Sequence, residues 1–110
     1  MKNKSITTIT IKGTIYDIQE TSQKRDYLGI TKPYNKQIAI TLDAQKQNVL
    51  EETIAHELFH AYMFECGHDE YYNDERLTHA FGRFAKELID NYFTILKTYQ
   101  NKQRSSEDAD

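Results

Sequence analysis

Five consecutive residues, His56 to His60 with the sequence His-Glu-Leu-Phe-His, constrain the fold of this chain more than any other segment. In an α-helix, residues four positions apart lie one turn apart on the same face. His56 and His60 can therefore direct two imidazoles at a single point if the segment is helical. A catalytic metal ion needs a third protein ligand, so a second element must pack beside this helix and supply one.

The residues around the two histidines have the periodicity of a helix. Between Asn48 and Cys66, apolar side chains recur every three or four residues, at Leu50, Ile54, Leu58 and Ala61. Asn48 followed by Glu51 resembles a capping box at the start of a helix. Gly67 suits the position just after a helix end. We therefore predict a helix over residues 48–66.

The first 42 residues have a different pattern, in which β-branched and apolar residues alternate with polar ones. This pattern is typical of half-buried strands. We predict strands at 5–11, 14–18, 27–31 and 37–42. Pro33 lies in a turn-like segment between the last two strands, which should therefore form an antiparallel hairpin.

A second helix is predicted over residues 73–99, after a polar loop at 67–72. Its apolar residues recur mostly three or four positions apart: Leu77, Ala80, Phe81, Phe84, Leu88, Tyr92, Ile95 and Tyr99. Residues 100–110 are polar or small, which favours a disordered tail. Together these elements predict one domain over residues 1–99. Its fold class would be α+β, with a small, mostly antiparallel sheet packed on two helices.

The segment at 56–60 matches the H-E-x-x-H pattern, whose chemistry is that of a zinc hydrolase. Bound zinc lowers the pKa of a coordinated water to about 7. Glu57 follows His56 beside the same helix face, where it can reach that water rather than the metal. We predict that Glu57 acts as the general base for attack on a carbonyl carbon.

The third ligand is left open by the sequence. An extended form of the motif would place a third histidine at position 66, but Cys66 occupies it. The second predicted helix offers Glu75 and His79, which are one turn apart. Glu75 would complete the two-histidine, one-glutamate set known for catalytic zinc, and we favour it. His79 is the alternative ligand, or a neighbour that orients a ligand or stabilises an oxyanion.

These segments resemble a known group of proteins. Thr53 to Ala61, then Glu65 to His68, then Asn73 to Leu77 are similar to the short zincin-like metallopeptidases of phages and other mobile elements, a minimal gluzincin core. More distantly they resemble the ImmA/IrrE-type and SprT-type proteins. The resemblance covers about residues 27–90. It implies a zinc site made by His56, His60 and a glutamate of the next helix. It also implies that strand 37–42 is the edge strand above the cleft, and that the substrate is a peptide or protein.

The composition argues against other classes of function. The net charge is -3, which disfavours nucleic-acid binding, and Cys66 is the single cysteine, so no intrachain disulfide can form. The apolar stretches are shorter than the roughly 20 residues of a membrane span, and the first residues lack the apolar region of a signal peptide. We therefore expect a cytoplasmic protein. Two rivals remain: a zinc-containing regulatory or binding module without catalysis, and a helical interaction protein without metal.

Overall fold

Strands occupy the first part of the chain and helices the second. The computed structural model describes residues 3–21, 27–41 and 46–108, with side chains described as far as residue 104. The strands are β1 (Lys4–Ile11), β2 (Thr14–Thr21), β3 (Gly29–Lys32) and β4 (Gln37–Thr41). The helices are α1 (Gln47–Glu65), α2 (Asp69–Tyr72) and α3 (Glu75–Asp108). This arrangement confirms the predicted α+β class.

The four described strands form one sheet in the order β1-β2-β4-β3. β1 and β2 pair antiparallel, and so do β3 and β4, which confirms the predicted hairpin. β2 and β4 pair in parallel, with Ile18 opposite Ile38. The sheet is therefore mixed, although two of its three pairings are antiparallel as predicted. Residue 42, which we had included in the last strand, lies outside the described residues.

The expectation that strand 37–42 is the edge strand is wrong. β4 lies between β2 and β3, and β3 forms the edge. Ile38, Ala39 and Ile40 are consecutive buried residues, a run that suits a central strand with both of its faces covered. β3 contains Gly29 and the exposed Lys32, and its four residues bury less than those of β4.

The core lies between the sheet and α1. Its buried residues are Ile11, Tyr16, Ile38, Ile40 and Ala61, surrounded by the partly buried Ile9, Ile18, Leu50 and Leu58. Three residues of the apolar stripe predicted on the first helix, Leu50, Leu58 and Ala61, therefore face the sheet, whereas Ile54 is 42% exposed. Burying each of the large side chains contributes about 1.5–3 kcal/mol to folding.

Glu65 is the last residue of α1, and its side chain contacts the sheet. The Tyr16 hydroxyl donates a hydrogen bond to Oε2 at 2.6 Å, and the Lys36 ammonium donates to the same oxygen at 2.7 Å. The Thr14 hydroxyl donates to Oε1 at 3.1 Å. The carboxylate thus ties the last turn of α1 to β2 and to the turn before β4.

The two ends of α1 differ in how well they were predicted. At the C-terminal end, Gly67 has φ 77°, its N–H donates to Phe64, and the N–H of His68 donates to Met63. This is a Schellman motif, as Gly67 indicated. At the start, the capping box is wrong, because α1 begins at Gln47 and its cap residue is Lys46. Asn48 therefore lies within the first turn, where its side chain cannot cap the helix.

The second part of the chain is more helical than predicted. The segment 67–72 contains α2, a single turn, and α3 begins at Glu75 instead of residue 73. Asp74 caps α3, since its Oδ1 accepts a hydrogen bond from the Leu77 N–H at 3.0 Å.

The predicted disorder of residues 100–110 is wrong as far as Asp108, where α3 ends, and the last two residues lie outside the described part. The chain contains no glycine or proline after Gly82, and its Lys, Gln, Arg and Glu residues favour a helix.

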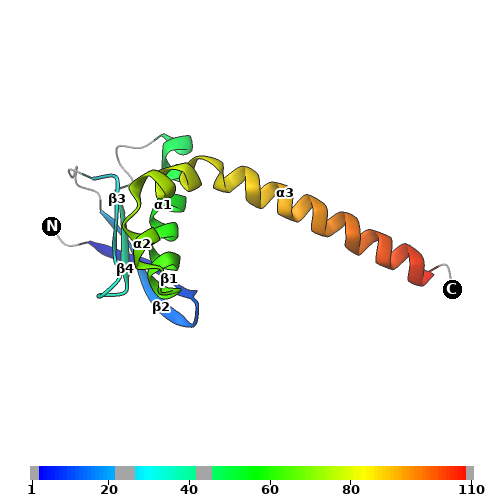
Figure 1. Cartoon of the computed structure of the whole chain (residues 1–110), viewed down its shortest axis with the longest axis horizontal. Helices are drawn as coiled ribbons and strands as arrows, with labels where there is room; N and C mark the ends of the chain where they lie inside the picture. Colours follow the sequence, from blue (N-terminus) through cyan, green and yellow to red (C-terminus); the bar gives the residue numbers. More distant parts are fainter. Residues whose placement is uncertain (1–2, 22–26, 42–45, 109–110) are drawn as a thin grey trace.

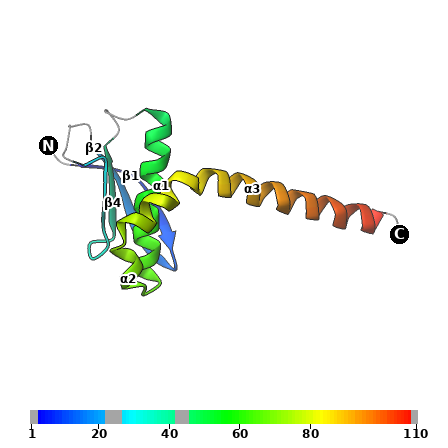
Figure 2. The ribbon, with the colours of Figure 1, turned by 45° about the horizontal axis from the view of Figure 1, so that its top comes forward.

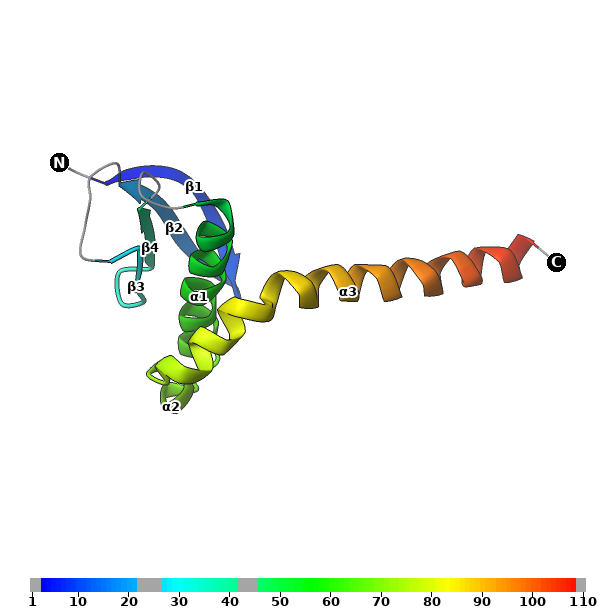
Figure 3. The same ribbon diagram turned by 90° about the horizontal axis from the view of Figure 1, so that it is seen from above.

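α3 gives the molecule its elongated shape. Its first turns cross α1, and the rest of the helix projects away from the sheet and the other helices (Figures 1, 2 and 3). The overall dimensions are 62 × 31 × 26 Å. Among the described helices, none combines the length and the apolar character that a membrane crossing requires.

Candidate metal centre

The crossing of α1 and α3 brings the predicted ligands together. Gly82 of α3 lies against the backbone of α1, and a Cβ atom at this position would be 3.0 Å from the main-chain carbonyl oxygen of Glu52. The same Cβ would lie 3.6 Å from Cβ of His56. Only a glycine allows so close an approach without displacement. Two turns earlier on α3, Glu75 consequently lies over the two histidines of α1.

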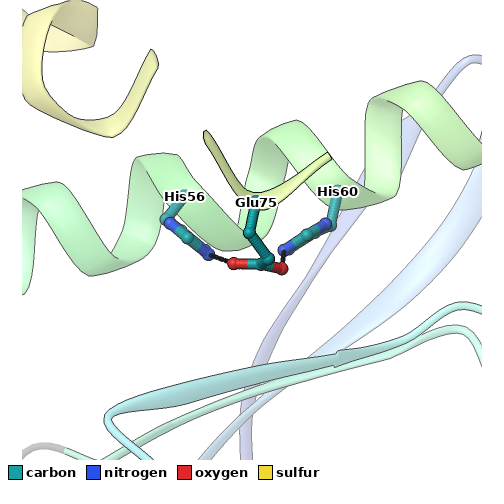
Figure 4. A group of neighbouring side chains, drawn as sticks. All are labelled: His56, His60 and Glu75. Carbon is teal, nitrogen blue, oxygen red and sulfur yellow. Dashed lines mark ion pairs between the residues drawn. The ribbon is translucent and has the colours of Figure 1, made fainter. Parts of the chain in front are cut away.

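Glu75 places one carboxylate oxygen against each histidine. Its Oε2 is 3.3 Å from Nε2 of His56, and its Oε1 is 2.9 Å from Nε2 of His60. Figure 4 shows the carboxylate between the two imidazoles. One potential ligand atom from each of the three residues lies within 4.8 Å of the others. The structure thus brings together the three residues that we favoured as ligands.

His60 is oriented by a second contact. Its Nδ1 lies 2.8 Å from the main-chain carbonyl oxygen of Tyr72, the last residue of α2. A carbonyl oxygen only accepts hydrogen bonds, so Nδ1 carries the proton. In the neutral imidazole, Nε2 therefore presents a lone pair to the Glu75 oxygen. Two such groups repel unless a proton or a metal cation lies between them, and a histidine held in this way is typical of metal sites.

Glu57 lies on the side of α1 that faces β3, and only 6% of its surface is exposed. The Thr31 hydroxyl is 2.8 Å from Oε1 of Glu57 and 2.9 Å from its main-chain carbonyl oxygen, so it can donate to either. Burial raises the pKa of the Glu57 carboxyl above its usual value, against the opposing effects of the Thr31 hydrogen bond and the two histidines. A carboxylate with a raised pKa is a stronger proton acceptor.

β3 reaches Glu57 because its first residue is a glycine. A Cβ atom on Gly29 would lie 2.8 Å from Cγ2 of Thr53, 2.9 Å from Cγ of Glu57 and 3.2 Å from Cδ1 of Ile40. Any larger residue would force the edge strand away from α1. Gly29 therefore sets the distance between β3 and the general base that we predicted.

Two open cavities adjoin the metal centre, and both include Gly29, His56 and Glu57. One has a volume of about 440 Å³ and is lined further by Ile30, Thr31, His60, Tyr72, Asn73 and Glu75. The other, of about 390 Å³, is lined further by Leu28, Val49, Glu52, Thr53, His79 and Gly82. Space for water and for a substrate is therefore present on either side of Glu57 and His56.

No protein-family model, curated protein or solved structure matches the chain. The function must therefore be argued from the chemistry of the site itself.

His79 lies outside the three-residue group. It is exposed, and the centre of its ring is 6.3 Å from the centre of the His56 ring. His79 lies one turn after Glu75 on α3, closer to Gly82, and lines the smaller cavity. Its place in the structure fits a neighbour of the centre better than a ligand.

Several residues that shape the site were missed by sequence reasoning. Thr31 and the carbonyl group of Tyr72 gave no signal, because both act through contacts between elements distant in the chain. Gly82 did give one, since an isolated glycine within a helical pattern often marks close packing. Gly29, at the start of a predicted strand, could have been interpreted in the same way.

Proposed function

We propose that this chain is a zinc-dependent peptidase that hydrolyses peptide bonds in peptides or proteins. The observation that carries the proposal is the convergence of His56, His60 and Glu75 on one point, with the carboxylate of Glu57 beside it. Two imidazoles and one carboxylate form the ligand set of one major class of catalytic zinc sites. Zinc held there would acidify a water molecule and polarise the substrate carbonyl group.

The roles of the protein residues follow from their positions. Oε2 of Glu57 is 4.0 Å from Nε2 of His56, too far for a direct hydrogen bond and suited to a group held between them. Glu57 accepts the proton of the attacking water and then transfers it to the nitrogen of the leaving amine. Thr31 keeps the carboxylate of Glu57 oriented. The main-chain carbonyl group of Tyr72 keeps Nε2 of His60 directed at the proposed metal site.

The edge position of β3 supports a peptide as the substrate class. Among the described strands, β3 pairs only with β4, and Gly29, Ile30 and Thr31 line the larger cavity. An extended peptide can add to such an edge through main-chain hydrogen bonds. The scissile carbonyl group of the peptide would then lie near Glu57 and the proposed metal site.

The open cavity favours a catalytic site over a purely structural one. Structural zinc sites have four protein ligands and no open position, whereas catalytic sites keep one position for water. Among the described residues, three side chains form the ligand group, and the cavity of about 440 Å³ adjoins them. A regulatory module with structural zinc remains the alternative, and an activity measurement separates it from the peptidase.

The first test is elemental analysis of the purified protein. We expect one zinc per chain, lost in His56→Ala and strongly reduced in Glu75→Ala. His79→Ala serves as the matched control and should keep its zinc. Absence of zinc from the wild type, after the ion has been supplied, would exclude the peptidase.

The second test addresses catalysis, with zinc-loaded protein and a library of internally quenched peptides. Glu57→Gln should keep its zinc and lose about 10²–10⁴-fold in rate, the usual contribution of a general base. A wild type that binds zinc but cleaves no faster than Glu57→Gln would favour the regulatory module.

A further inference from the structure

The outer part of α3 carries an apolar face that no described residue of the chain covers. From Lys86 to Arg104 every side chain is exposed except Leu96, which is partly buried. Figures 1 and 3 show this part of α3 projecting away from the domain. Six large apolar side chains in it are between 50% and 64% exposed: Leu88, Ile89, Tyr92, Phe93, Ile95 and Tyr99.

A helix of this kind needs a partner. In proteins, most helical stability comes from packing an amphipathic face against other elements. Apolar patches larger than a few hundred Å² usually mark interaction sites in soluble proteins. An aromatic side chain has about 150–250 Å² of surface that can be buried. With roughly half of each side chain exposed, these six residues together expose an area on the order of 500 Å² per chain.

The spacing of the apolar residues indicates that the partner is another helix. Phe81, Ala85, Leu88, Tyr92, Ile95 and Tyr99 are separated alternately by four and three residues. This is the a/d pattern of a coiled-coil seam. The first two residues of the seam already pack inside the domain, since the rings of Phe81 and Phe59 are 5.0 Å apart and Ala85 is 2% exposed. The seam then continues beyond the domain.

We propose that this seam pairs antiparallel with the same seam of a second copy of the chain. In this arrangement Leu88 lies opposite Tyr99 of the second copy, and Tyr92 lies opposite Ile95. Each layer thus combines an aromatic with an aliphatic side chain, which packs better than two large side chains facing each other. Two copies bury roughly 1,000 Å² in total, which is about the lower limit for a specific interface.

Parallel pairing is blocked by the domain itself. α1 already packs against α3 at Phe81, and Ala85 is buried on the same seam. Two parallel α3 helices would bring both copies of α1 into the space between them. Antiparallel helices place the two domains at opposite ends, so that each α1 lies beside only the last turns of the α3 of the second copy, beyond Tyr99. The seam also ends at Tyr99, because the next residue in its register is Lys102.

The charges favour the antiparallel arrangement as well. Four carboxylates and two positively charged side chains lie where the projecting part of α3 leaves the domain: Glu51, Glu52, Glu87, Asp90, Arg83 and Lys86. Residues 91–104 contain Lys97, Lys102 and Arg104 and no acidic residue. Antiparallel pairing brings the positively charged C-terminal part of each helix toward the carboxylates near the domain of the other copy. Parallel pairing would instead align the two positively charged parts.

The test is sedimentation equilibrium of the full chain over a range of concentrations. We expect two chains per particle at about 100 µM, consistent with the modest interface area. Ile95→Glu should weaken the dimer at least tenfold, because it places a charge in the seam. Asn101→Glu adds the same charge on the polar face of α3 and should leave the dimer unchanged. Hydrogen exchange of the sheet amides verifies that both variants keep their fold.

The orientation is tested by the distance between two spin labels, with Gln103→Cys introduced into the Cys66→Ser background. Antiparallel pairing places the two labels about 30 Å apart along the helix axis, from a rise of 1.5 Å per residue. Parallel pairing would place them about 10 Å apart. A single chain at every concentration, or a dimer unaffected by Ile95→Glu, would overturn the pairing through α3. The shorter distance would overturn the antiparallel arrangement.

Discussion

Gly82 of α3 lies so close to Glu52 of α1 that a Cβ atom on the glycine would be 3.0 Å from the main-chain carbonyl oxygen of Glu52. This contact sets the distance between the two helices that carry the ligand group. The carbonyl oxygen belongs to the backbone and cannot rotate away as a side chain would. The position of Glu75 relative to His56 and His60 therefore depends on a residue that binds no metal.

We expect Gly82→Ala to weaken zinc binding about tenfold, or about 1.4 kcal/mol, because the added methyl group separates α3 from α1 and displaces Glu75. Alanine has the higher helix propensity, so the change should not melt α3. Competition with a chromophoric chelator measures the affinity. Arg83→Ala, at the adjacent exposed position, is the control. Equal affinities for Gly82→Ala and the wild type would show that the crossing distance does not position Glu75.

Gly29→Ala tests the approach of β3 to Glu57. The new methyl group would lie 2.8 Å from Cγ2 of Thr53 and 2.9 Å from Cγ of Glu57, so the edge strand must move outward. Such overpacking destabilises a protein by about 1–3 kcal/mol, which urea denaturation measures. We expect peptide hydrolysis to fall while zinc content stays constant, because the ligands are on α1 and α3. A loss of zinc in this variant would contradict that separation.

Glu65→Gln tests the anchor of α1 and its dependence on pH. The hydrogen bond from Lys36, followed by that from Tyr16, holds the pKa of the Glu65 carboxyl below its usual value of 4.5. A carboxyl with a lowered pKa stabilises the fold above its unfolded-state pKa, and this contribution is lost as the pH falls through the folded-state pKa. We expect Glu65→Gln to cost about 1.5–3 kcal/mol at pH 7, as is usual for a hydrogen bond to a charged group.

The same variant should differ less from the wild type once the pH is below the folded-state pKa of Glu65, where the wild-type carboxyl is also neutral. Urea denaturation at several pH values measures both effects. Glu52→Gln, an exposed carboxyl on the same helix, is the control and should change little. A difference between Glu65→Gln and the wild type that is constant with pH would contradict a charged anchor.

Removal of the metal should loosen the contact between α1 and α3. Zinc that binds only the folded chain stabilises it by about 2.7 kcal/mol when the free ion is at 100 times its dissociation constant. A chelator should therefore lower the melting temperature of the wild type and of His79→Ala. His56→Ala should melt at the same temperature with and without chelator. An identical melting temperature for the wild type in both conditions would argue against a metal joining the two helices.

The sequence by itself determined the features that depend on neighbouring residues. The spacing of His56 and His60 places them on one face of any helix, and Gly67 ends that helix because it accepts a positive φ. The alternation in residues 37–41 and the turn at Pro33 were enough to predict the hairpin of β3 and β4. In each case the geometry is local, so the pattern alone was sufficient.

The tertiary structure decided the features that depend on contacts between distant segments. Glu75 and His79 are one turn apart on α3, and only the point at which Gly82 crosses α1 selects Glu75. The parallel pairing of β2 with β4 made β3 the edge strand, which no local pattern in residues 37–41 specifies. The burial of Glu57 and its contact with Thr31 arise in the same way. These features depend on how the elements pack. Packing results from many contacts between distant segments, and the sequence of one segment does not specify them.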